Sequence, residues 1–362
     1  SGTTPICDPA SNSCKTCTVN EGCGGATPVC QTLSNGGLGK CVVCTVERGC
    51  TEGTATPACD PTVFPNGACV ACVKGDDCPV PGSACDLNTN TCIPGGVDAG
   101  SGLPVFDDAG NLFVTDIPFG RVFRISPRGD WDLVAQWDGE PNGMKFLSAT
   151  ELLVTDYRHG LMLLDLPTGQ VRSYLERRNS ERFKGVNDLV FDSRGNLYFT
   201  DQGQTGLHDP TGRVYRLAPD GRLDLLLANV PSPNGIVLSA DERFLYVAAT
   251  RGNCVWRMPL QADGSVSKAG QFFTSHGPSG PDGLAMDESG RLLVANPGLG
   301  CLWVLNARAE PEVVLTGPPG ASITNLAFGG ADRKTVYCTD STHGDILRAE
   351  LSIAGARLHR LR

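Results

Sequence analysis

The strongest constraint on the fold of this chain is a sixfold repeat in its C-terminal part. Six short apolar segments can be stacked in register, and they end at Asp116, Asp156, Asp201, Thr250, Asn296 and Asp340. These ends are separated by 40, 45, 49, 46 and 44 residues, and a further short strand follows each of them. A repeat of this length with about four short strands is typical of a β-propeller, because a single blade cannot bury both of its faces. The repeat therefore predicts an all-β fold with a six-bladed β-propeller over residues 102–362.

The cysteines mark a second, different segment. Of the 17 in the chain, only Cys254, Cys301 and Cys338 lie beyond Cys92, which leaves 14 in the first 92 residues. Twelve of these form three sets that each open with C-x5-C, and the sets begin 27 and 28 residues apart. The rest of the segment is rich in Gly, Pro, Thr, Asn and Asp, so it cannot bury an apolar core of its own.

Disulfides and zinc both explain this cysteine spacing. The C-x2-C pairs resemble zinc half-sites, but residues 1–92 contain no histidine and each pair spans the junction between two sets. Small domains without a core depend on cross-links, each worth roughly 2–4 kcal/mol. We therefore expect a disulfide-rich repeat domain over residues 1–92, whose connectivity stays open, and a Gly-rich linker over 93–101. Disulfides imply a secreted, periplasmic or cell-surface protein, with the segment acting as a spacer or adhesion stalk for an unidentified partner.

Composition and motifs exclude several classes of function. The 30 Lys and Arg against 39 Asp and Glu give a net charge of −9, which argues against a basic nucleic-acid-binding face. No apolar run approaches the roughly 20 residues of a membrane-spanning helix. No serine stands in a nucleophile-elbow context with His and Asp partners, so serine-hydrolase chemistry has no support.

A second alignment places polar side chains in the first strand of each blade. Counting back four residues from the large apolar residue of that strand gives Asn142, Asn187, Asn234 and Asp282, and blade six supplies Asn325 one residue out of register. Because first strands line the central channel of a propeller, these oxygens should converge on one axis. Such a ring is a ligand set suited to Ca²⁺. Each Asn-Gly or Asp-Gly alone is also a common turn dipeptide, and only the shared register favours a site.

Three segments in consecutive blades carry a family resemblance: KGVNDLVFDSRGNLYFTDQGQTG, SPNGIVLSADERFLYVA and GPDGLAMDESGRLLVA. They resemble the family of gluconolactonase, the senescence-marker lactonase, luciferin-regenerating enzyme and the drug-resistance lactonases. Diisopropylfluorophosphatase is a more distant relative, and the resemblance covers about residues 102–350. It implies a divalent cation, usually calcium, at the mouth of the channel. By motif, the metal ligands would be Asn187, Asn234 and Asp282.

The resemblance implies a metal-dependent hydrolase that opens a small lactone or a related ester, with phosphotriesterase chemistry as a side activity. Asp282 would be a catalytic ligand and proton shuttle, and Asp188 would contact the substrate or assist the attacking water. The other substrate contacts would be Asn142, Asn187, His208 and Asn325. Two of these residues also fit simpler roles: Asp188 as a strand-end carboxylate satisfied by backbone amides, and His208 as a solvent-facing turn residue.

Blade one departs from the family pattern. Where relatives carry a glutamate ligand, this chain has Gly102 in GLPVFDD. The missing anionic ligand supports an alternative function, a non-catalytic secreted propeller that acts as a binding or adhesion module. The ligands retained in the later blades favour the enzyme.

The three propeller cysteines are expected to be free, buried thiols. Cys254 and Cys301 occupy the same position in adjacent blades, so a bridge between them is the alternative. Equivalent points on neighbouring blades are expected to exceed the roughly 7 Å limit on Cα separation in a disulfide.

Overall fold

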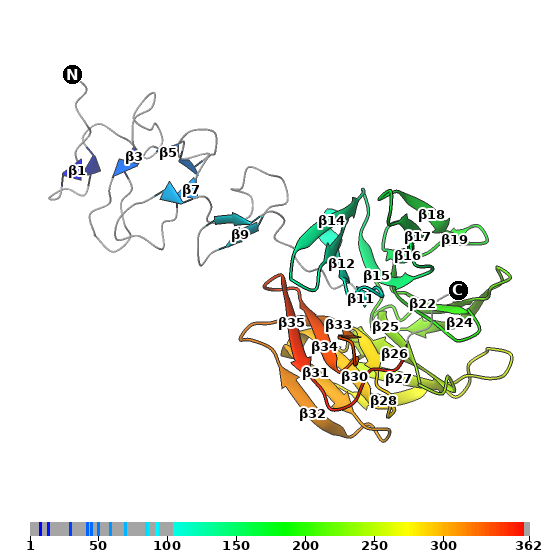
Figure 1. Ribbon diagram of the computed structural model, residues 1–362. Coiled ribbons are helices and arrows are strands. Elements are labelled where there is room, and N and C mark those ends of the chain that lie inside the picture. The colour runs from blue at the N-terminus through cyan, green and yellow to red at the C-terminus, as the bar shows by residue number, and fades with distance from the viewer. Residues whose placement is uncertain are drawn as a thin grey trace. The chain divides into compact units, whose positions relative to one another are not determined.

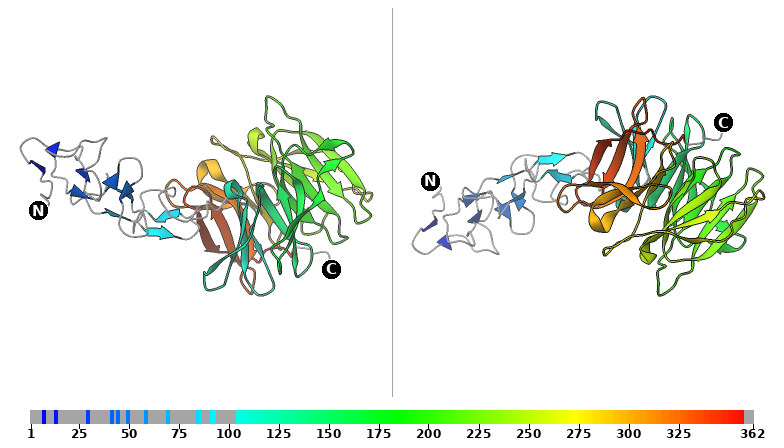
Figure 2. Two further views of the ribbon diagram at one scale, coloured as in Figure 1. Left: turned by 90° about the horizontal axis from the view of Figure 1, so that it is seen from above. Right: turned by 90° about the horizontal axis from the view of Figure 1, so that it is seen from below.

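The computed structural model describes residues 104–357, together with the backbone of short strands between Cys7 and Ile93. The chain divides into two units, Ser1–Val97 and Asp98–Arg362. The second unit is a six-bladed β-propeller, which confirms the all-β class and the number of blades (Figures 1 and 2). Gly102 lies outside the described residues. Among the described residues, no helix has the length and apolar character needed to cross a membrane.

Blades one to five are four-stranded antiparallel sheets whose strands follow one another in chain order. Blade one contains β11 (Val105–Phe106), β12 (Leu112–Asp116), β13 (Arg121–Ile125) and β14 (Trp131–Gln136). Blade two contains β15 (Pro141–Phe146), β16 (Glu151–Asp156), β17 (Gly160–Asp165) and β18 (Val171–Leu175). A small hairpin, β19 (Arg177–Arg178) and β20 (Glu181–Arg182), precedes blade three. Blade three contains β21 (Val186–Phe191), β22 (Leu197–Asp201), β23 (Gly212–Leu217) and β24 (Leu223–Val230).

The remaining blades follow the same plan. Blade four contains β25 (Pro233–Leu238), β26 (Phe244–Ala249), β27 (Cys254–Pro259) and β28 (Gly270–Thr274). Blade five contains β29 (Leu284–Met286), β30 (Leu292–Asn296), β31 (Cys301–Leu305) and β32 (Pro311–Thr316). Blade six contains β33 (Ile323–Gly329), β34 (Thr335–Asp340) and β35 (Asp345–Glu350). Three 3-10 turns join second to third strands: η2 (Ile117–Phe119), η3 (Thr250–Gly252) and η4 (Pro297–Leu299).

Blade six has three strands within the described part of the chain, one fewer than the repeat predicts. After β35 the chain turns back to blade five, where the amide of Glu288 donates to the carbonyl of Ala354 at 2.9 Å. The amide of Ala356 donates in turn to Met286 at 2.8 Å. These bonds hold residues 354–356 against blade five. The ring closes between blades one and six, where the rings of Phe106 and Tyr337 meet edge to face at 4.9 Å.

The core lies between the blades. Buried apolar residues form five clusters, and each cluster joins two neighbouring blades. Side chains of a strand alternate between its two faces, so each central strand contributes to the cluster on either side. Cys254, Cys301 and Cys338 are buried free thiols, which confirms that expectation, and Cys254 and Cys338 belong to two of these clusters.

In the N-terminal unit the structure describes the backbone of ten strands: β1 (Cys7–Asp8), β2 (Ser13–Cys14), β3 (Val29–Cys30), β4 (Cys41–Val42), β5 (Cys44–Thr45), β6 (Gly49–Cys50), β7 (Ala58–Cys59), β8 (Cys69–Val70), β9 (Ala84–Asp86) and β10 (Thr91–Ile93). They pair as five two-stranded antiparallel ladders. In every ladder two cysteines are register partners. The predicted disulfides concern side chains outside the described part of the structure.

Candidate functional site

Blades two to five each bring one polar side chain to the inner, channel-facing end of the fold. Asn142 in β15, Asn187 in β21, Asn234 in β25 and Asp282, just before β29, are only 4–7% exposed. The first strands β15 and β25, which carry two of them, lie near the centre of the ring of blades (Figure 1). The Oδ1 atom of each is buried and has no hydrogen-bond partner among the described residues. We call these four side chains the oxygen ring.

The oxygen ring fits a hard cation. Buried oxygens that accept no hydrogen bond cost free energy, and amide and carboxylate oxygens are ligands that Ca²⁺ accepts. Among residues 104–357, no three His, Cys, Asp or Glu side chains lie close enough to form a metal site by themselves. Amide oxygens would therefore supply most of the ligands, and Asp282 would be the anionic member.

Threonine hydroxyls fix the ring residues from the preceding blade. A threonine stands one residue before the end of β12, β16 and β22, and its hydroxyl donates to the backbone carbonyl of the next blade's ring residue. The pairs are Thr115 with Asn142, Thr155 with Asn187, and Thr200 with Asn234. The repeated Thr-Asp of the second strands therefore has a positional role that the sequence analysis did not identify.

Glycine follows three of the four ring residues because neighbouring blades approach closely there. A Cβ atom on Gly143 would lie 2.9 Å from the carbonyl oxygen of Asn187. A Cβ atom on Gly235 would lie 2.2 Å from the carbonyl oxygen of Asp282. Both glycines lie inside strands, β15 and β25. In blades two and four the Asn-Gly dipeptides are therefore parts of strands and not turns.

Asp188, the second predicted catalytic residue, is fully buried beside the ring. Its Oδ1 accepts the amide hydrogen of Leu189 at 2.6 Å, and its Oδ2 accepts that of Ile236 at 3.1 Å. The carboxylate thus connects β21 to β25. This is the geometry of the structural alternative, so a contact between Asp188 and the substrate stays a prediction.

Lys145 is a channel residue that the sequence analysis missed. It follows Asn142 by three positions in β15 and is 7% exposed. At the same register the other blades carry Val190, Val237, Ala285 and Ala327. The sequence signal that could have identified Lys145 is a lysine at a strand position where these blades carry small apolar residues. Burial lowers the pKa of the Lys145 ammonium to about 8, and the charge of Asp188 opposes that shift.

The charges of the channel depend on one another. Burial raises the pKa of Asp188 to about 6, while Lys145 and the two backbone amides oppose the rise. Burial, and secondly the charge of Asp188, raise the pKa of Asp282 well above its usual range. A hydrogen bond with Asn234 works in the opposite direction. A cation at the ring would offset the electrostatic cost of ionising Asp282.

Asn325 does not join the oxygen ring directly. It stands at the register of Asp188, and Thr324 takes the ring position of blade six. The Oδ1 of Asn325 accepts the amide hydrogen of Leu326 at 2.8 Å. This agrees with the offset of one residue in the sequence alignment. Its proposed contact with a substrate is untested.

A pocket of about 610 Å³ opens beside the ring, between the loops that follow β16, β22 and β26. Its lining consists of Tyr157, Gln202, Gly203, Gln204, Thr205, Gly206, Leu207, His208, Ser232 and Arg251. Gln202 connects pocket and ring: its Oε1 accepts from Nδ2 of Asn187, and its Nε2 donates to Oγ of Ser232, both at 2.9 Å. His208 is an exposed residue of this lining, and its contact with a substrate stays a prediction.

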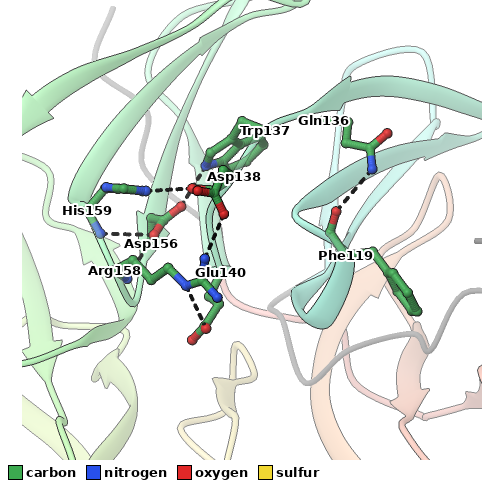
Figure 3. A network of polar contacts seen from close by, with 8 residues as sticks. All are labelled: Phe119, Gln136, Trp137, Asp138, Glu140, Asp156, Arg158 and His159. Carbon is green, nitrogen blue, oxygen red and sulfur yellow. Dashed lines mark hydrogen bonds and ion pairs between the residues drawn. The ribbon is translucent and has the colours of Figure 1, made fainter.

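Residues 137–140, which connect blades one and two, are held by a polar network shown in Figure 3. Nε1 of Trp137 donates to Oδ2 of Asp156 at 2.6 Å. Arg158 forms ion pairs with Asp138 at 2.7 Å and with Glu140 at 2.8 Å. The connector leads directly into β15, so this network positions the strand that carries Asn142.

The fold is that of a six-bladed propeller in which four blades each bring one buried, unpaired oxygen of residues 104–357 to the channel-facing side. Residues 99–342 match the family described as "SMP-30/Gluconolactonase/LRE-like region". The chain belongs to this family, as the resemblance implied.

Two curated relatives and one solved structure illustrate the similarity. The chain is 31% identical to a gluconolactonase of Zymomonas mobilis over 258 residues, 62% of this chain and 72% of the relative. It is 30% identical to lactonase drp35 of Staphylococcus aureus over 228 residues, 59% and 68% of the two chains. A calcium-binding protein, regucalcin, from Agrobacterium tumefaciens shares the fold with a TM-score of 0.63 and 23% identity, over 72% of this chain and 92% of that one.

Proposed function

We propose that the protein is a metal-dependent hydrolase that opens a lactone, or a related ester, at a divalent cation in the propeller channel. Membership of the gluconolactonase family and the names of the two curated relatives support a lactone hydrolase. The single observation that carries the proposal is the set of four buried oxygens, one from each of four consecutive blades, that have no hydrogen-bond donor among residues 104–357. Their chemistry matches calcium better than a softer metal.

Asn187, Asn234 and Asp282 would hold the cation, which supplies Lewis acidity toward the substrate carbonyl when bound. Asp282 would take the proton of the attacking water at its carboxylate and return it to the departing alkoxide. The amide of Asn142 would donate to a substrate hydroxyl. The substrate's remaining atoms would occupy the pocket that contains His208. A phosphotriester presents a similar polarised oxygen, so phosphotriesterase activity is proposed as a side activity.

Metal removal tests this function. Dialysis of the full chain against EDTA should lower its rate of D-glucono-1,5-lactone hydrolysis by about a hundredfold or more, because metal ions contribute several kcal/mol of charge stabilisation. Added calcium should restore the rate. Proton release, corrected for spontaneous hydrolysis, is the measurement. An unchanged rate in protein shown to be free of metal would contradict the proposal.

The alternative is a non-catalytic binding or adhesion propeller, and Gly102 at the expected glutamate position favours it. Loss of one carboxylate ligand weakens a calcium site whose remaining formal charge comes from Asp282. The same hydrolysis assay distinguishes the enzyme from the binding module. A fully calcium-loaded protein that hydrolyses neither lactones nor esters would support the binding module.

We also infer that residues 1–92 form a disulfide array in an oxidising location outside the cytoplasm. The register-paired cysteines are Cys7 with Cys14, Cys30 with Cys41, Cys44 with Cys50, Cys59 with Cys69, and Cys85 with Cys92. Cα atoms of such antiparallel partners lie about 4.5–5.5 Å apart, within the range that disulfides span. By the repeat, Cys17 would pair with Cys23 and Cys72 with Cys78.

Mass spectrometry of the non-reduced protein should therefore find no free thiol between Cys7 and Cys92 and three in the propeller. Peptide mapping should recover disulfide bonds that join each cysteine to the next cysteine along the chain, in the seven pairs given above. Stoichiometric zinc bound by reduced cysteines would contradict the disulfide array.

A further inference from the structure

The pocket beside the oxygen ring has a charge that is unusual for this protein. Its lining includes Arg251 and His208 and contains no Asp or Glu. The chain as a whole has 39 acidic and 30 basic residues, so a wall without carboxylates is not what its composition alone favours. The basic side chains of the lining therefore favour a negatively charged ligand.

The two basic residues of the lining both lie beside one glycine. A Cβ atom on Gly206 would lie 3.1 Å from Nδ1 of His208 and 3.6 Å from Cβ of Arg251. Arg251 is exposed and forms no ion pair within residues 104–357. By contrast, two arginines at the same end of the blades are each paired with a carboxylate. They are Arg158, in the turn after β16, and Arg213, near the start of β23. Arg251 is thus left available to a ligand.

The walls of the pocket are braced from both sides. Nε2 of Gln204 donates to the hydroxyl of Tyr157 at 2.7 Å, which joins the blade-three loop to blade two. The amide of Ser232 donates to Oγ1 of Thr205 at 3.1 Å, which joins the same loop to the start of blade four. A pocket held in this way needs little reorganisation when a ligand binds, which favours specific recognition.

The base of the pocket leads to the site of reaction. Gln202 lies in the lining and accepts a hydrogen bond from Asn187, whose own Oδ1 belongs to the oxygen ring. A substrate with its lactone carbonyl at the ring would therefore extend toward Arg251. A guanidinium presents a planar fork of donors that matches a carboxylate or a phosphate.

We propose that this pocket binds an anionic substituent of the substrate and that Arg251 is a specificity-determining residue, so that the preferred substrates are acidic sugar lactones. The proposal rests on the lactonase function proposed above. The chemical class is a lactone that carries a second, free acid group. Arg251 would bind that group without taking part in the ring opening.

A matched pair of substrates tests the proposal on the full, calcium-loaded chain. D-glucaro-1,4-lactone and D-glucono-1,4-lactone differ in a carboxylate against a hydroxymethyl group. Arg251→Gln should raise KM for the acidic lactone about tenfold to a hundredfold, the range for a hydrogen bond to a charged group. It should leave kcat, and KM for the neutral lactone, unchanged. Arg194→Gln is the control, because it removes one positive charge from the β21–β22 turn at the other end of blade three.

A binding measurement separates this proposal from the lactonase function. Calorimetry should detect D-galacturonate binding more tightly than D-galactose in the wild type, and Arg251→Gln should abolish the difference. If neutral lactones are hydrolysed but the two 1,4-lactones have equal KM values that the substitution leaves unchanged, the acidic preference is refuted while the lactonase function stands. If the uronate binds through Arg251 but no lactone is hydrolysed, the anion site is supported and the lactonase function fails.

Discussion

Asp282→Asn should lower kcat/KM for lactone hydrolysis by about a thousandfold, the effect expected when charge stabilisation at a reacting centre is removed. Asp282 is the one carboxylate of the oxygen ring, and its Oδ1 is buried without a hydrogen-bond donor among residues 104–357. Asparagine has the same shape but lacks both the charge and the basic site for the proton. The loss should appear mainly in kcat.

The same substitution should not unfold the metal-free protein. Burial and the charge of Asp188 raise the pKa of Asp282, so the ionised carboxylate is disfavoured in the folded state. Removing it should leave the melting temperature in EDTA unchanged or higher. Asp220→Asn, in the turn between β23 and β24 at the far end of blade three, is the matched control and should be fully active. Near-normal turnover by Asp282→Asn would show that the reaction takes place elsewhere.

Lys145→Met should lower the free energy of unfolding at pH 7, because it removes the positive charge that partly offsets the burial of the Asp188 carboxylate. Lys145 and Asp188 are both buried, and each opposes the shift in the other's pKa. Without the ammonium, Asp188 would retain only the amides of Leu189 and Ile236. Urea unfolding of the metal-free chain, monitored by tryptophan fluorescence, would measure the change.

A double-mutant cycle identifies the cause of that loss. Asp188→Asn alone should also destabilise the protein, because it leaves Lys145 as a buried charge without its compensating carboxylate. The double variant should be more stable than the sum of the two single effects predicts. Additive effects would mean that the two side chains are independently important for packing and that their charges do not interact.

Much of the propeller could be predicted from sequence because its repeat is local. The strands that end at Asp116, Asp156 and Asp201 recur with the same alternation, and alternation determines which side chains enter the clusters between blades. The ring positions followed from the same register. The repeat carries no information about the bonds that take residues 354–356 to blade five, and these were found only in the structure.

What the sequence analysis missed depends on contacts between blades. Lys145 and Asp188 interact although they lie in different blades, and neither residue alone indicates a pair. From sequence, the glycine after Asn142 fits a turn as well as a strand. Only the close approach of Asn187 in the structure explains why glycine is required at this position. The pocket at Arg251 likewise forms from three loops whose lengths differ from blade to blade.

The central claim is that the oxygen ring is the cation site on which hydrolysis depends, and calcium titration of the metal-free full chain by calorimetry tests it most directly. We expect the wild type and Asp220→Asn to bind the same number of calcium ions, and Asp282→Asn to bind one fewer. Because Asp282→Asn changes the ring and Asp220→Asn leaves it intact, calcium bound elsewhere in the chain would cancel in the comparison. Equal calcium binding by all three proteins, or none by the wild type, would contradict the claim.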